Sequence, residues 1–307
     1  MAGVEYREIT CKSALNRVEG MPFRWSLNPY RGCVHGCCYC YARATHRYFD
    51  LGAGRDFTGI IFVKVNLPDV LARELSRRTW GREPVAVGTA TDPYQPAEGR
   101  YRLTRRALEL FAWFRTPVSL VTKGTMILRD LDVLQELARR ADLTVCMSMP
   151  TVDREIWRRT EPGTPPPAQR LRALERLVAA GVHAGVLMAP LLPGLSAAPA
   201  QVERAVRAAA DHGARFLGAN VLHLGPHVRE EFFGFLAREY PDLVEGYRRL
   251  YPGKYAAGAY RTRVEERVRA ARAAAGFAET ARGRPVDREA EPRQLALPLT
   301  GPPSGGG

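Results

Sequence analysis

The chain has 307 residues, of which 46% are hydrophobic, and its formal net charge at pH 7 is +13. This length and this apolar content suffice for one large domain with a buried core, with or without an appendage. The sequence contains no apolar run of about 18 residues, and its charged N-terminal stretch lacks the apolar centre of a signal peptide. We therefore exclude a membrane-spanning class and expect a cytoplasmic protein.

The positive charge leaves two interpretations open. A strongly basic protein can bind a polyanion such as DNA or RNA by neutralising phosphates. The basic residues are mainly arginines spread along helical stretches, however, and no single basic patch stands out. Nucleic acid is therefore a possible partner, and an arginine-rich composition without functional meaning is the alternative.

Taken in chain order, short apolar runs alternate with helical patterns. We predict a first strand at 24–28 and an additional strand at 60–66, followed by a helix at 68–78. Further strands are predicted at 85–89, 118–122, 143–149, 182–190 and 214–222, with helices at 130–141 and 168–180. Connections of this length require parallel strands, so the pattern predicts an α/β fold, either a full or partial barrel or a doubly wound sheet.

The alternation stops near residue 225. We predict a barrel domain over residues 1–225, a C-terminal helical extension over 226–282 and a disordered tail over 283–307, which is rich in Pro, Gly and charge. Within that tail, the apolar stretch 294–299 could dock on a partner or on its own domain. In parallel α/β folds the carboxyl ends of the strands gather functional groups, so we expect the loops after the predicted strands to converge on one site.

The most informative motif is CVHGCCYC, which contains Cys33, Cys37 and Cys40 with the spacing C-x3-C-x2-C. Three thiolates leave one iron of a cubic 4Fe-4S cluster without a protein ligand. A zinc site that also uses Cys38 is the alternative, but neighbouring cysteines diverge too far to share one ion comfortably. We therefore favour the cluster and interpret Cys38 as a packed thiol.

This motif resembles the C-x3-C-x-aromatic-C signature of radical S-adenosylmethionine (SAM) enzymes, with Tyr39 at the aromatic position. The wider set RWSLNPYRGCVHGCCYCYAR, GTATDPYQPAE, LVTKGTMILRDLDVL and APLLPGL is similar to the spore photoproduct lyase-like branch of that superfamily. The resemblance covers roughly residues 20–225. It implies a partial parallel (β/α)6 barrel with C-terminal helices, a 4Fe-4S cluster and SAM as cofactors, and reductive cleavage of SAM to a 5'-deoxyadenosyl radical.

The resemblance also implies roles for particular residues. Tyr39 would lie near the adenine of SAM, Lys123 would pair with its carboxylate, and Ser148 would donate or accept a hydrogen bond. Asp92, in a polar loop after the second predicted barrel strand, is our candidate acceptor for the SAM amino group. Arg170 occupies a position where such enzymes often place a polar residue near the ribose or carboxylate, although a surface arginine on a helix is the more common finding.

One departure from the family pattern concerns the reaction. Spore photoproduct lyase carries a hydrogen-donating cysteine after its second strand, where this chain has TATDPYQPAE and no cysteine. Thymine-dimer repair is therefore in doubt. Cys146, which alternation places on the same strand face as Ser148, is a weak candidate for a substitute donor, and a buried apolar thiol is the alternative.

We expect a radical SAM enzyme, with nucleic-acid repair or modification as one possible reaction and an electron donor such as flavodoxin or ferredoxin as a partner. Action on a small molecule or a peptide is a second possibility. A non-catalytic iron-sulfur or zinc protein is a third.

Overall fold

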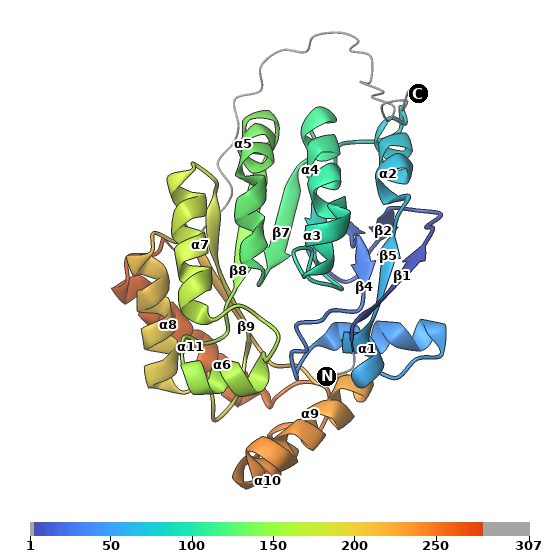
Figure 1. Ribbon diagram of the computed structural model, residues 1–307. Helices are drawn as coiled ribbons and strands as arrows, with labels where there is room; N and C mark the ends of the chain where they lie inside the picture. The colour runs from blue at the N-terminus through green and yellow to red at the C-terminus, as the bar shows by residue number, and fades with distance from the viewer. Residues whose placement is uncertain (1–2, 279–307) are drawn as a thin grey trace, which may run out of the picture.

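The computed structural model describes residues 3–278 and contains an open α/β sheet flanked by helices (Figure 1). The seven-stranded sheet has the order β10-β9-β8-β7-β6-β3-β2. Strand β3 and strands β6 to β10 run parallel to one another, and β2 pairs antiparallel with β3 at one edge. The strands are β2 (Leu15–Arg17), β3 (Trp25–Leu27), β6 (Val85–Val87), β7 (Val118–Thr122), β8 (Leu143–Ser148), β9 (Ala184–Leu191) and β10 (Leu217–Val221). The predicted parallel α/β fold is confirmed, and the sheet stays open as in a partial barrel.

Helices connect the parallel strands and cover the outer face of the sheet, where α2, α4, α5 and α7 stand in a row in Figure 1. They are α2 (Leu67–Leu75), α4 (Leu103–Trp113), α5 (Leu131–Arg140), α7 (Pro167–Ala179) and α8 (Pro199–Asp211). The 3.6-residue apolar period is what places Leu134 and Leu137 of α5, and Leu174 and Leu177 of α7, in the main core. All four of these leucine side chains are fully buried.

The additional strand predicted at 60–66 belongs to a separate sheet. β5 (Ile60–Lys64) pairs in parallel with β1 (Glu5–Ile9) and antiparallel with β4 (Tyr30–Arg31). β4 intervenes between β3 and the cysteine motif, so the motif does not follow the first barrel strand directly as predicted. The short helices α1 (Arg55–Gly59), η1 (Tyr41–Phe49), α3 (Ala97–Tyr101), η2 (Thr125–Asp130) and α6 (Arg154–Thr160) lie in the connections.

The C-terminal part is helical as expected. α9 (Pro226–Glu239) and α10 (Val244–Leu250) are separated by the short turn η3 (Pro241–Leu243), because Pro241 cannot continue a hydrogen-bonded helix. Phe232 and Tyr247 of this hairpin pack with Cys37 and Tyr39 in a second hydrophobic cluster. α11 (Gly258–Ala274) instead contributes Val264 and other residues to the main core.

The predicted tail 283–307 lies outside the described residues, and the domain boundary at residue 225 stays a prediction. None of the helices within residues 3–278 has the length and apolar character needed to cross a membrane.

Candidate active site

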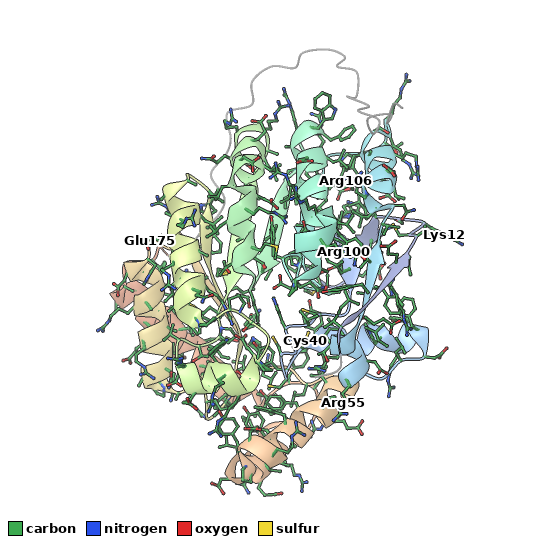
Figure 2. The ribbon with its side chains drawn as sticks, in the orientation of Figure 1. Lys12, Cys40, Arg55, Arg100, Arg106 and Glu175 are labelled. Atoms are coloured by element: carbon green, nitrogen blue, oxygen red, sulfur yellow. The ribbon has the colours of Figure 1, made fainter. Side chains whose placement is uncertain are left out.

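The cysteine loop, residues 33–40, lies deep in the molecule, and Figure 2 shows Cys40 between the ends of the strands and α9. Its backbone is held from several sides. Cys33 N donates to Phe57 O at 3.0 Å, and Cys38 N donates to Thr160 O at 3.0 Å. From the loop after β6, the Gln95 side chain accepts from Val34 N at 3.2 Å and donates to Gly32 O at 3.0 Å. The three thiols therefore sit on a fixed backbone rather than on a mobile one.

Two glycines allow this close packing. Gly32 has a φ of +83°, and a Cβ there would lie 2.7 Å from the carbonyl oxygen of Ile60. At Gly163, in the loop between α6 and α7, a Cβ would lie 2.4 Å from Val34 O, while its N–H donates to His35 O at 3.0 Å. The loop after α6 can thus touch the cysteine loop only because residue 163 has no side chain.

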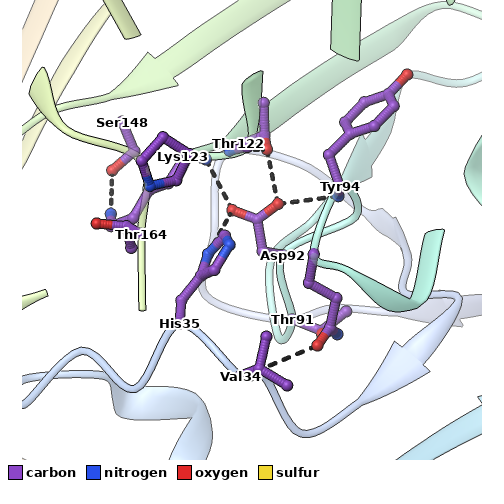
Figure 3. Close-up of polar contacts among 12 residues, drawn as sticks. Val34, His35, Thr91, Asp92, Tyr94, Thr122, Lys123, Ser148 and Thr164 are labelled. Atoms are coloured by element: carbon purple, nitrogen blue, oxygen red, sulfur yellow. Dashed lines mark hydrogen bonds and ion pairs between the residues drawn. The ribbon is translucent and has the colours of Figure 1, made fainter. Parts of the chain in front are cut away.

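Asp92 connects the loop after β6 to the end of β7 and to the cysteine loop (Figure 3). Its Oδ1 accepts from Thr122 Oγ1 at 2.6 Å and from Tyr94 N at 2.9 Å, and its Oδ2 accepts from Lys123 N at 2.7 Å. His35 Nδ1 lies 3.3 Å from the same Oδ2. Burial opposes ionisation of Asp92, but the neighbouring His35 charge and these hydrogen bonds outweigh it and lower the pKa of Asp92 to about 2.

Three hydrogen-bond donors and the neighbouring His35 ring therefore surround this one carboxylate. In this structure Asp92 holds the backbone of Lys123 and lies beside His35, and its role as the acceptor for an amino group stays a prediction.

Lys123 and Ser148, predicted at the ends of neighbouring strands, do meet. Lys123 Nζ donates to Ser148 Oγ at 2.5 Å and lies 5.8 Å from the centre of the Tyr39 ring. It also lies 3.4 Å from Oε1 of Glu161, a residue that the sequence reasoning missed. Residues from the cysteine loop, β7, β8 and the loop after α6 converge here, as expected for the carboxyl ends of parallel strands.

Arg170 is fully buried, so the alternative interpretation of Arg170 as a surface arginine is wrong. Its guanidinium donates to Glu161 Oε2 at 2.5 Å, to Ser148 O at 2.9 Å and to Pro165 O at 2.8 Å, and it also contacts Thr164. Its donors are thus directed to protein acceptors. We name Tyr39, Lys123, Ser148, Glu161 and Arg170 the strand-end cluster.

Glu161 is the centre of the strand-end cluster. Its carboxylate accepts from Arg170 and from the Tyr39 hydroxyl, and it faces Lys123. Burial by itself raises the pKa of Glu161, but the charges of Arg170 and Lys123 reverse that effect and lower it to about 2. Burial, followed by the Glu161 charge, raises the pKa of Tyr39 well above its usual value. The Glu161 carboxylate is therefore the acceptor of this hydrogen bond, and the Tyr39 hydroxyl is the donor.

Cys146 and Cys38 are not part of the strand-end cluster. Cys146 is half-buried in the middle of β8, and burial raises its pKa to about 11, so it is a neutral thiol. Cys38 is half-buried and packs against the second hydrophobic cluster. Both positions are compatible with the packed thiols that the sequence suggested.

The sequence predicted no site role for His35 or Gln95 and did not single out Glu161, although each is a buried polar residue of a loop. For Glu161 the signal was an acidic residue followed by Pro-Gly-Thr-Pro, a turn that ends α6. Polar residues in such turns are usually solvated, and only the packing of this turn on the cysteine loop makes Glu161 a buried residue.

The donor set of the cysteine loop fits a 4Fe-4S cluster. Cys33 and Cys37 are each 7% exposed, and Cys40 is half-buried. Burial raises the pKa of the Cys37 thiol, while the Lys123 cation acts in the opposite direction and favours the thiolate that binds iron. Within residues 3–278 no three Cys, His, Asp or Glu side chains are arranged to hold a single metal ion. In a cubic cluster each thiolate binds a different iron, so convergence on one point is not required.

The chain is similar to known proteins in sequence and in fold. The chain is 43% identical over 270 residues to an uncharacterized protein of Mycobacterium tuberculosis strain H37Rv, covering 87% of this chain and 79% of that protein. It is 25% identical over 170 residues to a "Radical SAM Nalpha-GlyT isomerase" of Pseudomonas phage M6, covering 54% of this chain and 33% of the phage protein.

Among solved structures, the fold is similar to that of a spore photoproduct lyase mutant with bound AdoMet and dinucleoside spore photoproduct. The TM-score is 0.69 at 16% sequence identity, with 88% of this chain and 79% of the lyase chain covered. At this identity the likeness concerns the fold. The model of the Radical SAM superfamily matches residues 27–209, which is more than half of the chain, and the chain therefore belongs to the radical SAM superfamily.

Proposed function

We propose that this protein binds a 4Fe-4S cluster through Cys33, Cys37 and Cys40 and binds SAM beside it, and that it acts on a nucleic acid. When bound, the cluster supplies an electron for reductive cleavage of SAM to a 5'-deoxyadenosyl radical, which abstracts hydrogen from the substrate. The observation that carries the proposal is the position of Lys123, whose cation stands beside Cys37, Tyr39 and Ser148 at the convergence of the strand ends.

The chain's own residues supply binding and orientation. The strand-end cluster contains two cations, Lys123 and Arg170, and only one carboxylate, Glu161, so it carries a surplus positive charge in a buried place. The N–H groups of the Arg170 guanidinium donate hydrogen bonds to protein atoms and hold Glu161 and Ser148 in place. Lys123 thus remains the cation that can form a charge-assisted hydrogen bond with the SAM carboxylate.

Tyr39 and Ser148 complete the binding side. The Tyr39 ring is held by its hydroxyl, which donates to Glu161, and by the Lys123 cation 5.8 Å from the ring centre. A fixed aromatic face of this kind suits the adenine of SAM. Ser148 Oγ, which accepts from Lys123, can turn its own hydrogen toward a ligand. Burial of Ser148 and Tyr39, at 4% and 6% exposure, excludes water from this side of the site.

A direct test is anaerobic reconstitution with iron and sulfide, followed by reduction with dithionite in the presence of SAM. We expect the wild type to form 5'-deoxyadenosine, detected by chromatography. Cys37→Ala should lose both this product and the visible absorption of the cluster, whereas Cys146→Ala, the matched control, should retain both. If the reconstituted wild type forms no 5'-deoxyadenosine, and alanine at Cys37 leaves the iron content unchanged, the proposal is wrong and a non-catalytic metal protein remains.

The nucleic-acid part of the proposal rests on two supports: the net charge of +13 and the fold shared with a lyase bound to a dinucleoside photoproduct. Fluorescence anisotropy with DNA and RNA oligonucleotides tests it. We expect the logarithm of the affinity to fall linearly with the logarithm of the salt concentration. Absence of binding at low salt would contradict it and favour a small molecule or a peptide. Deuterium transfer from labelled candidates into 5'-deoxyadenosine then identifies the substrate.

A further inference from the structure

An open groove of about 540 Å³ lies behind the cysteine loop, between α6, α9 and η1. Its floor includes Gly36 and Cys38, the two residues that flank Cys37 in sequence. Cys37 itself does not line the groove, but both of its neighbours in sequence do. The groove is a second approach to the cysteine loop, in addition to the one beside Lys123 and Ser148.

The groove is rich in arginine. Arg43, Arg158, Arg159 and Arg238 line it, against two carboxylates, Glu231 and Glu239. Arg158 and Arg238 are exposed and stand on opposite walls, on α6 and α9. These two arginines are therefore presented to an approaching surface, where Arg158 also pairs with Glu155 at 2.9 Å and Arg159 lies 3.9 Å from Glu239.

Arg43 adds a buried positive charge at the floor. It is 6% exposed, and its guanidinium donates to Gly36 O at 3.0 Å, Cys37 O at 3.1 Å, Ala53 O at 2.9 Å and Gly54 O at 3.2 Å. Within residues 3–278 the ion pairs include none with Arg43. Its guanidinium carbon also lies 5.4 Å from the centre of the Phe57 ring, within the limit of about 6 Å for a cation–π contact. Carbonyl oxygens reduce the cost of burying this charge, but they leave its net positive value at the back of the cysteine loop.

We propose that this groove docks an acidic one-electron carrier protein, which delivers the electron for SAM cleavage from the back of the cysteine loop. The inference rests on the proposed function, because reductive cleavage requires one electron per SAM. The carrier loses one electron and the cluster gains it, with no proton transferred. The arginines that line the groove are complementary in charge to an acidic carrier. The cysteine loop contributes to the floor of the groove, so the path of the electron to the cluster is short.

The test uses a double variant, Arg158→Glu with Arg238→Glu, and a flavodoxin as the acidic carrier. The first readout is the dissociation constant of oxidised flavodoxin, measured by titration calorimetry on the cluster-loaded protein at several salt concentrations. We expect the double variant to bind at least about tenfold more weakly and to lose most of the salt dependence. Arg139→Glu, an exposed charge reversal on α5 with a 75% exposed side chain, is the matched control and should bind like the wild type.

The second readout separates this inference from the proposed function. 5'-Deoxyadenosine formation driven by reduced flavodoxin should fall in the double variant, while formation driven by dithionite should not change. Failure of the dithionite reaction in the wild type would refute the proposed function instead. If flavodoxin binding is weak and insensitive to salt in the wild type, or equal in both proteins, the docking inference is wrong. Loss of oligonucleotide binding with flavodoxin binding intact would also overturn it, because the groove would then belong to the nucleic acid.

Discussion

Two buried polar clusters of this protein contain similar residues but differ in charge balance. The strand-end cluster sets one carboxylate, Glu161, against two cations, Lys123 and Arg170. The outer cluster, near α3 and η2, sets two carboxylates, Glu98 and Asp130, against Arg129, with Arg105 in contact with Asp130 at 3.2 Å.

The two carboxylates of the outer cluster are hydrogen-bonded by groups of the protein. Glu98 accepts from Tyr30, Thr104 N, Arg105 N and Arg129, and Asp130 accepts two hydrogen bonds from Arg129. Such a network holds elements together and leaves no unbalanced cation for a ligand. The strand-end cluster keeps a surplus cation in a buried place, which is costly unless an anion is bound there. The comparison indicates that charge imbalance, rather than the number of polar residues, distinguishes the site from the scaffold.

The largest expected effect is on stability. Glu161→Gln leaves two buried cations without their carboxylate, so we expect the free energy of unfolding to fall by about 3 kcal/mol or more. Glu98→Gln leaves Arg129 paired with Asp130 and should cost only about 1–2 kcal/mol. Urea titration followed by circular dichroism measures both. Equal losses would mean that the two clusters do not differ as described.

The second prediction concerns SAM affinity and compares two buried lysines. Lys123→Met should weaken SAM binding to the cluster-loaded protein by about tenfold to a hundredfold, the value of a lost charge-assisted hydrogen bond. Lys64 is also buried, but its Nζ donates to Asn28 O in the other sheet region. Lys64→Met is therefore the control. Its affinity for SAM, measured by anaerobic equilibrium dialysis, should equal that of the wild type. A similar loss in both variants would remove the special role of Lys123.

The third prediction uses pH. The folded pKa of Glu161 is lowered to about 2 from an ordinary 4.5, so its stabilisation is fully present above pH 4.5 and is lost as the pH falls toward 2. The stability difference between wild type and Glu161→Gln should shrink by about 2 kcal/mol between pH 5 and pH 3.

For Glu98 the direction is the opposite. Burial raises its pKa in the folded state, so its ionisation disfavours folding, and its contribution improves as the pH falls through the folded pKa. The difference between wild type and Glu98→Gln should thus grow in acid. Parallel pH profiles for the two variants would contradict the assigned pKa directions.

The smallest effect is expected at Cys146, which lies on the same face of β8 as Ser148 and belongs to neither cluster. Cys146→Ala should cost about 1 kcal/mol of stability and leave iron content and SAM cleavage unchanged. If 5'-deoxyadenosine forms normally but the substrate-derived product is lost, measured by mass spectrometry on the identified substrate, Cys146 is the hydrogen donor after all.

Local sequence determined much of the fold. Apolar runs with period 2 or 3.6 placed β7 within the predicted residues and α5 and α7 within one residue of their predicted bounds. The apolar period is a property of neighbouring residues, so it can be predicted without knowing distant contacts. The cysteine spacing likewise predicted a 4Fe-4S cluster. Lys123 and Ser148 lie in contact because the carboxyl ends of adjacent parallel strands share an edge of the sheet.

Only the tertiary structure decided the surroundings of Asp92, Glu161 and Arg170. Asp92 was expected to face a ligand, yet protein donors surround it, and Arg170 occupies a helix whose pattern allows either exposure or burial. Burial and ion pairing depend on which loops pack together, and here that depended on Gly163 admitting one loop onto another. The sequence by itself determined the strands, the spacing of the three cysteines and the edge where the strand-end cluster forms. The charge balance of that site is a property of loops brought together from distant parts of the chain.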